Sequence, residues 1–227
     1  MNWFIKLFSS TLGKKLVMAI TGLFLISFLV IHLIGNLQLL KYDGGRAFNV
    51  YAQFMTHNPV IKTISYTLYT SIIVHIVWAI MLTVRNNSAR GNTGYQVVNN
   101  SSTLASRNMG ILGTFIFIFL VIHLKDFWAV MHWGKIDAVD YDGQSYKDLY
   151  TITATAFKEL WYVALYVISM VMLAFHLWHG FGSAFQTLGL NHIKYNNLIN
   201  FVGKAFAIIV PALFALIPIW MFYFQNQ

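Results

Sequence analysis

Four histidines lie inside long apolar stretches of this 227-residue chain, one in each of four stretches: His32, His75, His123 and His176. An imidazole inside a lipid bilayer is costly unless it has a partner, so such a residue is a functional candidate. The stretch at residues 161–182, WYVALYVISMVMLAFHLWHGFG, is typical because it surrounds His176 and carries no formal charge. A helix needs about 20 such residues to cross the bilayer core.

The composition is that of a membrane protein with several spans. Hydrophobic residues make up 58% of the chain and charged residues only 10%, whereas charged residues make up about 25% of a typical soluble domain. The chain has no cysteine, which excludes disulfides, iron–sulfur clusters bound by this chain and haem attached through thioether bonds. The net charge of +8, on so little solvated surface, favours lipid headgroups and partner subunits over nucleic acid.

The apolar pattern predicts one all-α membrane domain with five transmembrane helices. We expect the spans at about 16–40, 62–84, 109–131, 160–182 and 203–224. The last span contains Pro211 and Pro218, which neighbouring helices can accommodate in lipid, so we expect it to be kinked. Residues 1–15 predict a helix lying in the membrane interface. They do not read as a signal peptide, because the apolar core that follows is too long and has no A-x-A site.

The connections predict one further short helix. Residues 41–61 place Phe48 and Tyr51 at helical spacing, which indicates a short interfacial helix that ends before Pro59. Residues 86–106 are rich in Asn, Ser, Gly and Thr and therefore predict a polar loop.

Five spans place the two termini on opposite sides of the membrane. The basic residues divide almost evenly between the sides, eight against seven, but all seven acidic residues lie on the side opposite the N-terminus. The rule that basic residues stay inside weakens for long connections such as residues 124–160. We expect the N-terminus inside, and name the two sides inner and outer on that basis.

Two histidines match in depth when measured from the inner surface. His32 follows Lys15 by 17 residues and His123 follows Arg107 by 16 residues. At ~1.5 Å per helical residue, they lie ~25 and ~24 Å from that surface. The sequence therefore predicts that His32 and His123 form a pair toward the outer side.

The other two histidines lie on helices that run in the opposite direction. His75 follows Lys62 by 13 residues and His176 follows Glu159 by 17 residues. These spacings place them ~20 and ~25 Å from the outer surface, hence in the inner half. We therefore expect His75 to pair with His176, about ten ångströms of depth away from the first pair.

Paired imidazoles on four helices suit haem. Two neutral imidazoles hold haem iron six-coordinate, which favours electron transfer over oxygen binding. Flat apolar walls and small residues that allow close approach occur one turn from the histidines at Phe28, Gly35, Ala79, Phe119 and Gly180. We therefore expect four of the five spans to form a bundle around two haem b groups.

Other interpretations stay open at this point. A single histidine in a span is more often a hydrogen-bonding residue between helices than a ligand. Four in two depth-matched pairs favour metal. His179 follows His176 by three residues and shares its face, so it is an alternative ligand or a partner for a haem propionate. The three histidines in or beside loops fit a solvated or interfacial role better: His57, His132 and His192.

Several passages together are similar to one known family. They read GKKLVMAITGLFLISFLVIHLIGNLQ, AFNVYAQFM, ASRNMGILG, LVIHLKDFW and AFHLWHGFGSAFQTLGLNH. They resemble the di-haem cytochrome b membrane-anchor subunit of succinate dehydrogenase (succinate:quinone oxidoreductase), which is related to fumarate reductase. The likeness covers nearly the whole chain, and is closest to the single-chain, five-helix anchor of bacteria that use a menaquinone-type acceptor.

The resemblance implies the site and the setting. The axial ligands of the family fall on His32, His75, His123 and His176 with the pairing expected from depth. A flavoprotein and an iron–sulfur protein would bind on the inner side of the bacterial cytoplasmic (inner) membrane. Electrons would pass between succinate and membrane quinone through the haems, or run in reverse with fumarate. The chain lacks any flavin-binding pattern, so it would not catalyse succinate chemistry by itself.

This sequence departs from the family pattern at one position, and the partners of the haem propionates are predicted from the charge of the residues. Some di-haem fumarate reductases carry a helix carboxylate two residues before the last ligand, where this chain has Ala174, so proton movement by that route is not expected. Lys14, Lys15 and Arg107 are the expected counter-charges for inner haem propionates. No quinone-contact residue can be named from the sequence.

Two functions from other classes remain as alternatives. A haem-free anchor would only hold partners at the membrane. A small five-span transporter would use the histidines to line a substrate or proton path, but transporters tend to show paired broken helices and an inverted repeat, and the sequence shows neither.

Overall fold

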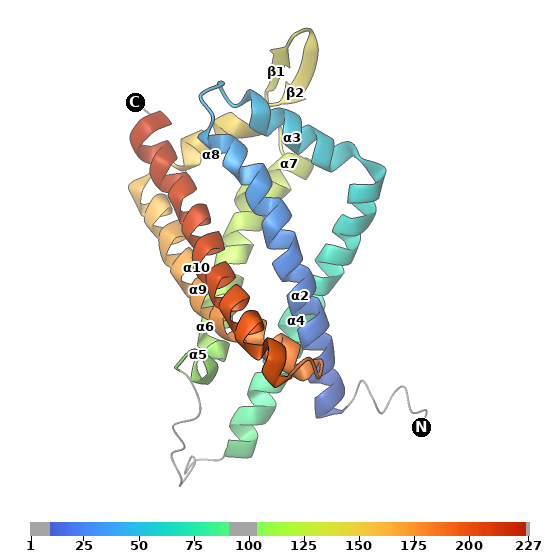
Figure 1. Ribbon diagram of the computed structural model, residues 1–227. Coiled ribbons are helices and arrows are strands. Elements are labelled where there is room, and N and C mark those ends of the chain that lie inside the picture. The colour runs from blue at the N-terminus through green and yellow to red at the C-terminus, as the bar shows by residue number, and fades with distance from the viewer. Residues whose placement is uncertain (1–9, 91–103, 226–227) are drawn as a thin grey trace.

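A computed structural model describes residues 10–90 and 104–225 and shows an all-α membrane protein. Within these ranges, five helical segments are long and apolar enough to cross a membrane (Figure 1): Thr11–Leu40, Pro59–Ser88, Met109–Trp133, Leu160–Thr187 and Ile193–Gln225. Each extends beyond the predicted span at one end or both. Hydropathy marks the part of a helix in contact with lipid, whereas the helix itself continues into the more polar interface.

The spans combine α-helices with short segments of other helical geometry. The first three are α2 (Thr11–Asn36) followed by the 3-10 turn η1 (Leu37–Leu40), α4 (Pro59–Arg90), and α6 (Met109–His123) followed by the π-helical turn η2 (Leu124–Ala129) and α7 (Val130–Trp133). The last two are α9 (Leu160–Thr187) and α10 (Ile193–Trp220), which ends in the π-helical turn η3 (Met221–Gln225). A single helical turn, α5 (Leu104–Arg107), precedes α6.

The first span begins earlier than predicted. The hydroxyl of Ser10 accepts a hydrogen bond from the backbone N–H of Gly13 at 3.0 Å, which is the usual way for a serine to start a helix. Residues 11–15 therefore belong to the first spanning helix and not to a separate interfacial helix. The rest of the predicted interfacial helix, residues 1–9, lies outside the described residues, as do residues 91–103 of the predicted polar loop.

Helix α10 contains both prolines of the last span. Pro211 and Pro218 are buried, and α10 packs chiefly along α9. Pro218 lies one turn before the π-helical turn η3, and the N–H of Met221 reaches the carbonyls of both Ile217 and Pro218. A proline cannot donate a backbone hydrogen bond, and the wider turn is the local adjustment that follows it.

The helices are not all neighbours of one another. Helix α2 packs against α4, α9 and α10, and α9 packs against α2, α6 and α10. In the described structure, α2 is not closely packed against α6, nor is α4 closely packed against α9. Each of these two pairs of helices lies diagonally across the bundle.

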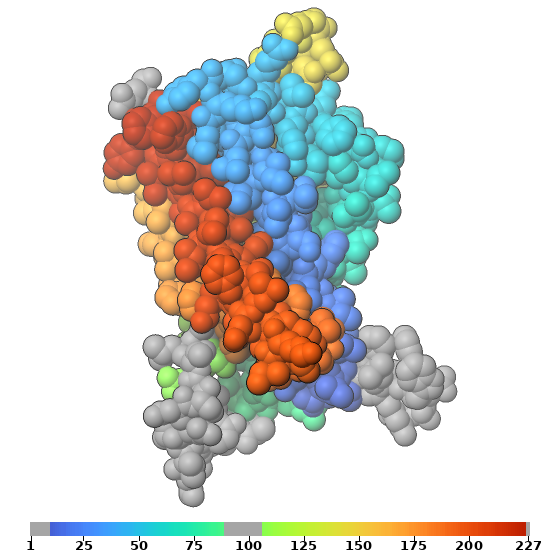
Figure 2. All heavy atoms as spheres, viewed as in Figure 1, coloured from blue at the N-terminus to red at the C-terminus, as the bar shows by residue number. Residues whose placement is uncertain are grey.

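One end of the bundle is covered by short elements, which we call the cap. It consists of α3 (Arg46–His57), the hairpin β1 (Ala138–Tyr141) and β2 (Gln144–Lys147), and α8 (Leu149–Ala156). Figure 1 shows η3 ending at the cap end and α2 beginning at the opposite end. Figure 2 shows the hairpin, in yellow, at the cap end in space-filling form. Helix α3 is the short helix predicted within residues 41–61, whereas the hairpin and α8 were not predicted.

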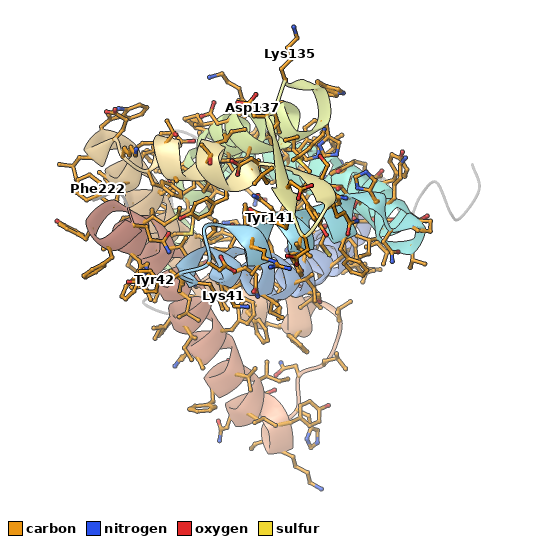
Figure 3. All side chains as sticks on the ribbon, turned by 90° about the horizontal axis from the view of Figure 1, so that it is seen from above. Lys41, Tyr42, Lys135, Asp137, Tyr141 and Phe222 are labelled. Atoms are coloured by element: carbon orange, nitrogen blue, oxygen red, sulfur yellow. The ribbon has the colours of Figure 1, made fainter. Side chains whose placement is uncertain are left out.

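One buried side chain ties the cap together. Asn49 on α3 is 1% exposed. Its amide nitrogen donates to the hydroxyl of Tyr141 at 3.1 Å and to Oδ1 of Asp148 at 3.0 Å, and its oxygen accepts from the backbone N–H of Tyr150 at 2.9 Å. Figure 3 looks down on this end, with Tyr141 labelled among the side chains of the cap. A single amide thus connects α3, the hairpin and α8.

We expect Asn49→Ala to destabilise the protein by about 1–3 kcal/mol, because it leaves the partly buried backbone N–H of Tyr150 without its acceptor and removes the two hydrogen bonds that the amide donates. Thermal unfolding in detergent should show a midpoint several degrees lower. The control is Asn197→Ala on α10, where the side chain is exposed and no change is expected. An unchanged midpoint for Asn49→Ala would contradict this role.

The carboxyl group of Asp148 makes part of this stability dependent on pH. Burial by itself would raise its pKa, but hydrogen bonds from the Thr151 hydroxyl, the Asn49 amide and the Thr151 backbone N–H outweigh burial and lower the pKa below its ordinary 3.8. A lowered pKa stabilises the folded state above the unfolded-state pKa, and the contribution disappears as the pH falls through the lowered value.

We therefore expect the thermal stability of the protein to fall as the pH drops below about 4. We expect the thermal stability of the Asp148→Asn variant to fall less steeply over that range. The measurement is the unfolding midpoint of both proteins from neutral to acid pH. Equal slopes for the two proteins would show that other carboxyl groups account for the acid sensitivity.

Candidate functional site

The four histidines of the spans meet in two pairs. The ring centroids of His32 on α2 and His123 on α6 are 5.7 Å apart. The ring centroids of His75 on α4 and His176 on α9 are 6.4 Å apart. We call the first the cap-side pair and the second the far pair. Each pair joins two diagonal helices that run in the same direction, so the juxtaposition expected from depth is present in the structure.

The two pairs lie farther apart than expected. On α2, the hydroxyl of Thr21 is 3.1 Å from Nδ1 of His75, and Thr21 precedes His32 by eleven residues. On α9, Tyr166 contacts the cap-side pair and precedes His176 by ten residues. At ~1.5 Å per residue, both helices give a separation of about 15 Å along their axes, where about ten was predicted.

Aromatic rings surround the cap-side pair. Phe28 stacks on His32 with ring centroids 5.1 Å apart, and Phe214 of α10 lies 5.6 Å from the same ring. Phe119 stacks on His123 at 5.7 Å. These contacts come from three different helices and give the pair the flat apolar surroundings that were expected of a haem site.

Two of the histidines have a hydrogen-bonding partner for Nδ1 on another helix. Nδ1 of His75 is 3.1 Å from the Thr21 hydroxyl, which itself donates to the carbonyl of Val17 at 2.8 Å. Nδ1 of His123 is 3.0 Å from the hydroxyl of Tyr166. When Nδ1–H donates such a bond, the neutral imidazole keeps Nε2 free to bind a metal.

The other two histidines differ. The amide nitrogen of Asn36 lies 3.4 Å from Nδ1 of His32 and donates at 2.7 Å to the carbonyl of that same residue. Nδ1 of His176 is buried and has no hydrogen-bond partner among the described residues. Space is also open beside Gly180, one turn farther along α9. The described residues therefore leave the hydrogen-bonding capacity of this imidazole unsatisfied, which is unusual for a buried polar atom.

The number of ligands restricts the kind of metal. Among the described residues, no group of three or more His, Asp or Glu side chains could hold a metal ion. Zinc sites use three or four protein ligands, so two nitrogens fit a metal whose remaining positions are filled by a macrocycle. Two imidazoles on opposite sides of one metal, each bound at about 2.0 Å, have ring centres roughly 6 Å apart. The measured 5.7 and 6.4 Å match that spacing.

The remaining candidates are placed as follows. His176, and not His179, is the residue whose ring lies against His75, and His179 is half-buried. Lys14 and Lys15 lie in the first turns of α2, and Arg107 ends α5, all at the end opposite the cap. The described structure shows no ion pair of these three cations.

One small residue has a different role from the one predicted. A Cβ atom on Gly35 would overlap the ring of Tyr51, whose hydroxyl donates to the carbonyl of Ile31 at 3.3 Å. Gly35 therefore admits a side chain of the cap, not a prosthetic group. Gly22 is the glycine that approaches the far pair, because a Cβ there would lie 3.4 Å from Cε1 of His75. Gly22 was missed because the spacing of residues along α4 does not reveal which residues of α2 face α4.

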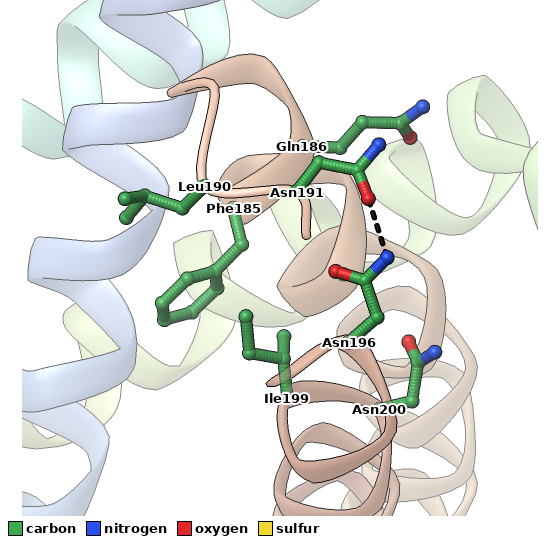
Figure 4. Close-up of a pocket in the computed structure, with 8 residues that line it drawn as sticks. Phe185, Gln186, Leu190, Asn191, Asn196, Ile199 and Asn200 are labelled. Atoms are coloured by element: carbon green, nitrogen blue, oxygen red, sulfur yellow. Dashed lines mark hydrogen bonds between the residues drawn. The ribbon is translucent and has the colours of Figure 1, made fainter. Parts of the chain in front are cut away.

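Two hollows are lined by uncharged residues, several of them polar. One lies at the turn between α9 and α10 (Figure 4), where the amide of Asn196 donates to Oδ1 of Asn191 at 2.6 Å. The other lies between α2 and α4 and is lined by Thr21, Tyr66, Thr67, Thr70, Ser71 and Val74. The second adjoins the far pair, because Thr21 is also the partner of His75.

Comparison with known proteins identifies no relative: no protein-family model, no curated protein and no solved structure matches this chain.

We expect Gly35→Ala to destabilise the protein by about 1–3 kcal/mol, because Tyr51 must move to accommodate the new methyl group. The unfolding midpoint in detergent measures this change. The matched control is Gly113→Ala on α6, where a Cβ meets nothing within 4 Å, and where the better helix propensity of alanine should preserve or raise the midpoint. Equal midpoints for the two variants would contradict the assigned role of Gly35.

Proposed function

We propose that this chain holds two haem b groups, one between His32 and His123 and one between His75 and His176. The observation that carries the proposal is the presence of two separate imidazole pairs, with ring centroids 5.7 and 6.4 Å apart, inside an apolar helical bundle. The porphyrin supplies four ligands to haem iron, which can take up to two more from the protein. A pair of histidines would supply both of these.

The residues around the pairs have defined tasks in this proposal. A bound haem supplies a one-electron carrier. Two histidines would hold each haem, which would suit it to electron transfer and not to oxygen binding. Thr21 and Tyr166 accept hydrogen bonds from Nδ1 and so fix the orientation of His75 and His123. The helices that hold each pair are not closely packed against each other, so the contact between them is made by side chains.

We further propose that the chain is the membrane anchor and electron-transfer subunit of a succinate:quinone oxidoreductase. In this role the end opposite the cap faces the bacterial cytoplasm and binds an iron–sulfur subunit, which in turn binds the flavoprotein. Lys14, Lys15 and Arg107 lie at that end, whereas all seven acidic residues lie at or near the cap. Electrons would pass through the far pair and then the cap-side pair to a quinone, for which the resemblance noted above implies the menaquinone type.

The test is the spectrum and haem content of the protein purified in detergent. We expect reduced-minus-oxidised spectra of a b-type cytochrome and two haems per chain by the pyridine haemochrome method. Alanine at either member of a pair should remove one haem and leave the other, because each pair is held by its own two helices.

Two further variants provide the controls. His57→Ala in the cap should keep both haems. His179→Ala should also keep both, because His176 is the residue that faces His75. A wild-type protein without haem would leave a haem-free anchor or a transporter as the function. Loss of a haem in His179→Ala but not in His176→Ala would reassign that ligand.

A further inference from the structure

A chain of hydrogen bonds links the cap-side pair to a carboxylate at the edge of the cap. Asp126 Oδ2 accepts from the hydroxyl of Tyr162 at 2.9 Å, the hydroxyls of Tyr162 and Tyr166 are 3.4 Å apart, and the hydroxyl of Tyr166 is 3.0 Å from Nδ1 of His123. We propose that Asp126 acts through the two tyrosines as a positioning residue that orients His123 and sets the reduction potential of the haem it holds. This inference rests on the proposed function.

The direction of the hydrogen bonds follows from the carboxylate. Asp126 is paired with Lys125, whose Nζ is 3.1 Å from Oδ1, and a carboxylate can only accept hydrogen bonds. Tyr162 must therefore donate its one hydrogen to Asp126, and its oxygen is left to accept from Tyr166. Tyr166 in turn accepts from His123. The proton of the imidazole is thereby fixed on Nδ1, and Nε2 is left bare for iron.

The two tyrosines are shielded from water and lipid. Tyr162 is 5% exposed and Tyr166 is 7% exposed. The ring of Tyr166 contacts Phe119, Phe127 and Phe157, with ring centroids 4.9, 6.3 and 5.1 Å away. In such apolar surroundings each hydrogen bond is electrostatically stronger than in water, and successive bonds polarise one another. The effect of the carboxylate can therefore reach an imidazole that it does not touch.

The backbone geometry at this place is also unusual. The π-helical turn η2 begins directly after His123 and contains Asp126. Turns of this kind are rare and are often found at functional sites. Here the turn connects His123 to Asp126, the two residues at the ends of the series of hydrogen bonds.

The far pair has no comparable connection in the described structure. His75 reaches the neutral hydroxyl of Thr21, which ends on a backbone carbonyl, and Nδ1 of His176 has no partner there. An imidazole that donates toward a carboxylate is a stronger electron donor to its metal than one that donates to a neutral group. The series of hydrogen bonds through Tyr166 therefore stabilises the ferric state of the cap-side haem selectively. The far haem serves as an internal reference.

The experiment is a redox titration of the purified holoprotein, with the two haems followed by their spectra. We expect Tyr166→Phe to shift the ferric-to-ferrous equilibrium of the cap-side haem about tenfold toward ferrous, which is about 59 mV for a one-electron couple. Tyr162→Phe and Asp126→Asn should shift it in the same direction. The double variant of Tyr166→Phe with Asp126→Asn should shift it no further than Tyr166→Phe alone, because the connection is already broken.

The controls separate this role from general damage. The far haem should keep its potential in every variant. Tyr69→Phe removes a hydroxyl that accepts from the Trp128 indole at 2.8 Å and should leave both potentials unchanged. If Tyr166→Phe loses the cap-side haem, Tyr162→Phe decides the matter, since Tyr162 carries no charge and its hydroxyl bonds to Asp126 and Tyr166.

Three results would overturn the proposal in distinguishable ways. Two haems with an unchanged cap-side potential in Tyr162→Phe and Asp126→Asn would refute the inference and leave the proposed function intact. Additive shifts in the double variant would show that the charge of Asp126 acts directly through space and not through the tyrosines. A wild-type protein without haem would refute the proposed function, and this inference with it.

Discussion

The absence of water in the bilayer core is the constraint on which this structure depends. Backbone groups there must be paired within each segment, which makes the five spans helical. The same constraint acts on side chains, because a buried polar atom without a partner costs about 1–3 kcal/mol. The imidazoles of His75 and His123 meet it with hydroxyl groups from neighbouring helices. Nδ1 of His176 does not meet it, and it lies in one of the two pairs that we propose to bind a metal.

The cap fixes the helix that serves both pairs. Asn49 ties α3 to the hairpin and α8, while Tyr51 of α3 fits against Gly35 of α2. The cap end of α2 is thereby joined to the segments that follow α7 and precede α9. His32 lies one turn before Gly35, and Thr21 lies deeper on the same helix. A polar cluster outside the membrane thus helps to set the depth of ligands within it.

Depth could be predicted from the sequence, but the direction of side chains around a helix could not. The rise of a helix is constant, so flanking charges located His32 beside His123 without knowledge of packing. The same charges underestimated the separation of the two pairs, because each pair was counted from a different surface and the distance between the two surfaces is not fixed by the sequence. The partners of Gly35 and Gly22 depend on rotation about the helix axis, which apolar stretches on all sides do not reveal.

Two other features were missed for local reasons. The hairpin turns at Asp142 and Gly143, which have positive φ values of 56° and 80°, and an Asp-Gly dipeptide is a strong hairpin signal. It was overlooked within a long connection between spans. The hydrogen bonds that link Asp126 to His123 depend on the π-helical turn η2 and on Tyr162 and Tyr166 of another helix. No regular helical spacing predicts that these residues meet.

The division of tasks among the helices explains how two pairs can be held at a fixed separation. Helices α2 and α9 pack against each other, and each contacts both pairs: α2 through Thr21 and His32, and α9 through Tyr166 and His176. Helices α4 and α6 each contribute to one pair. The distance between the pairs is therefore set by one helix interface, whereas the fit within each pair is adjusted by a separate helix. Electron transfer between two carriers is sensitive to their separation, so placing both pairs along the α2–α9 interface suits the function proposed above.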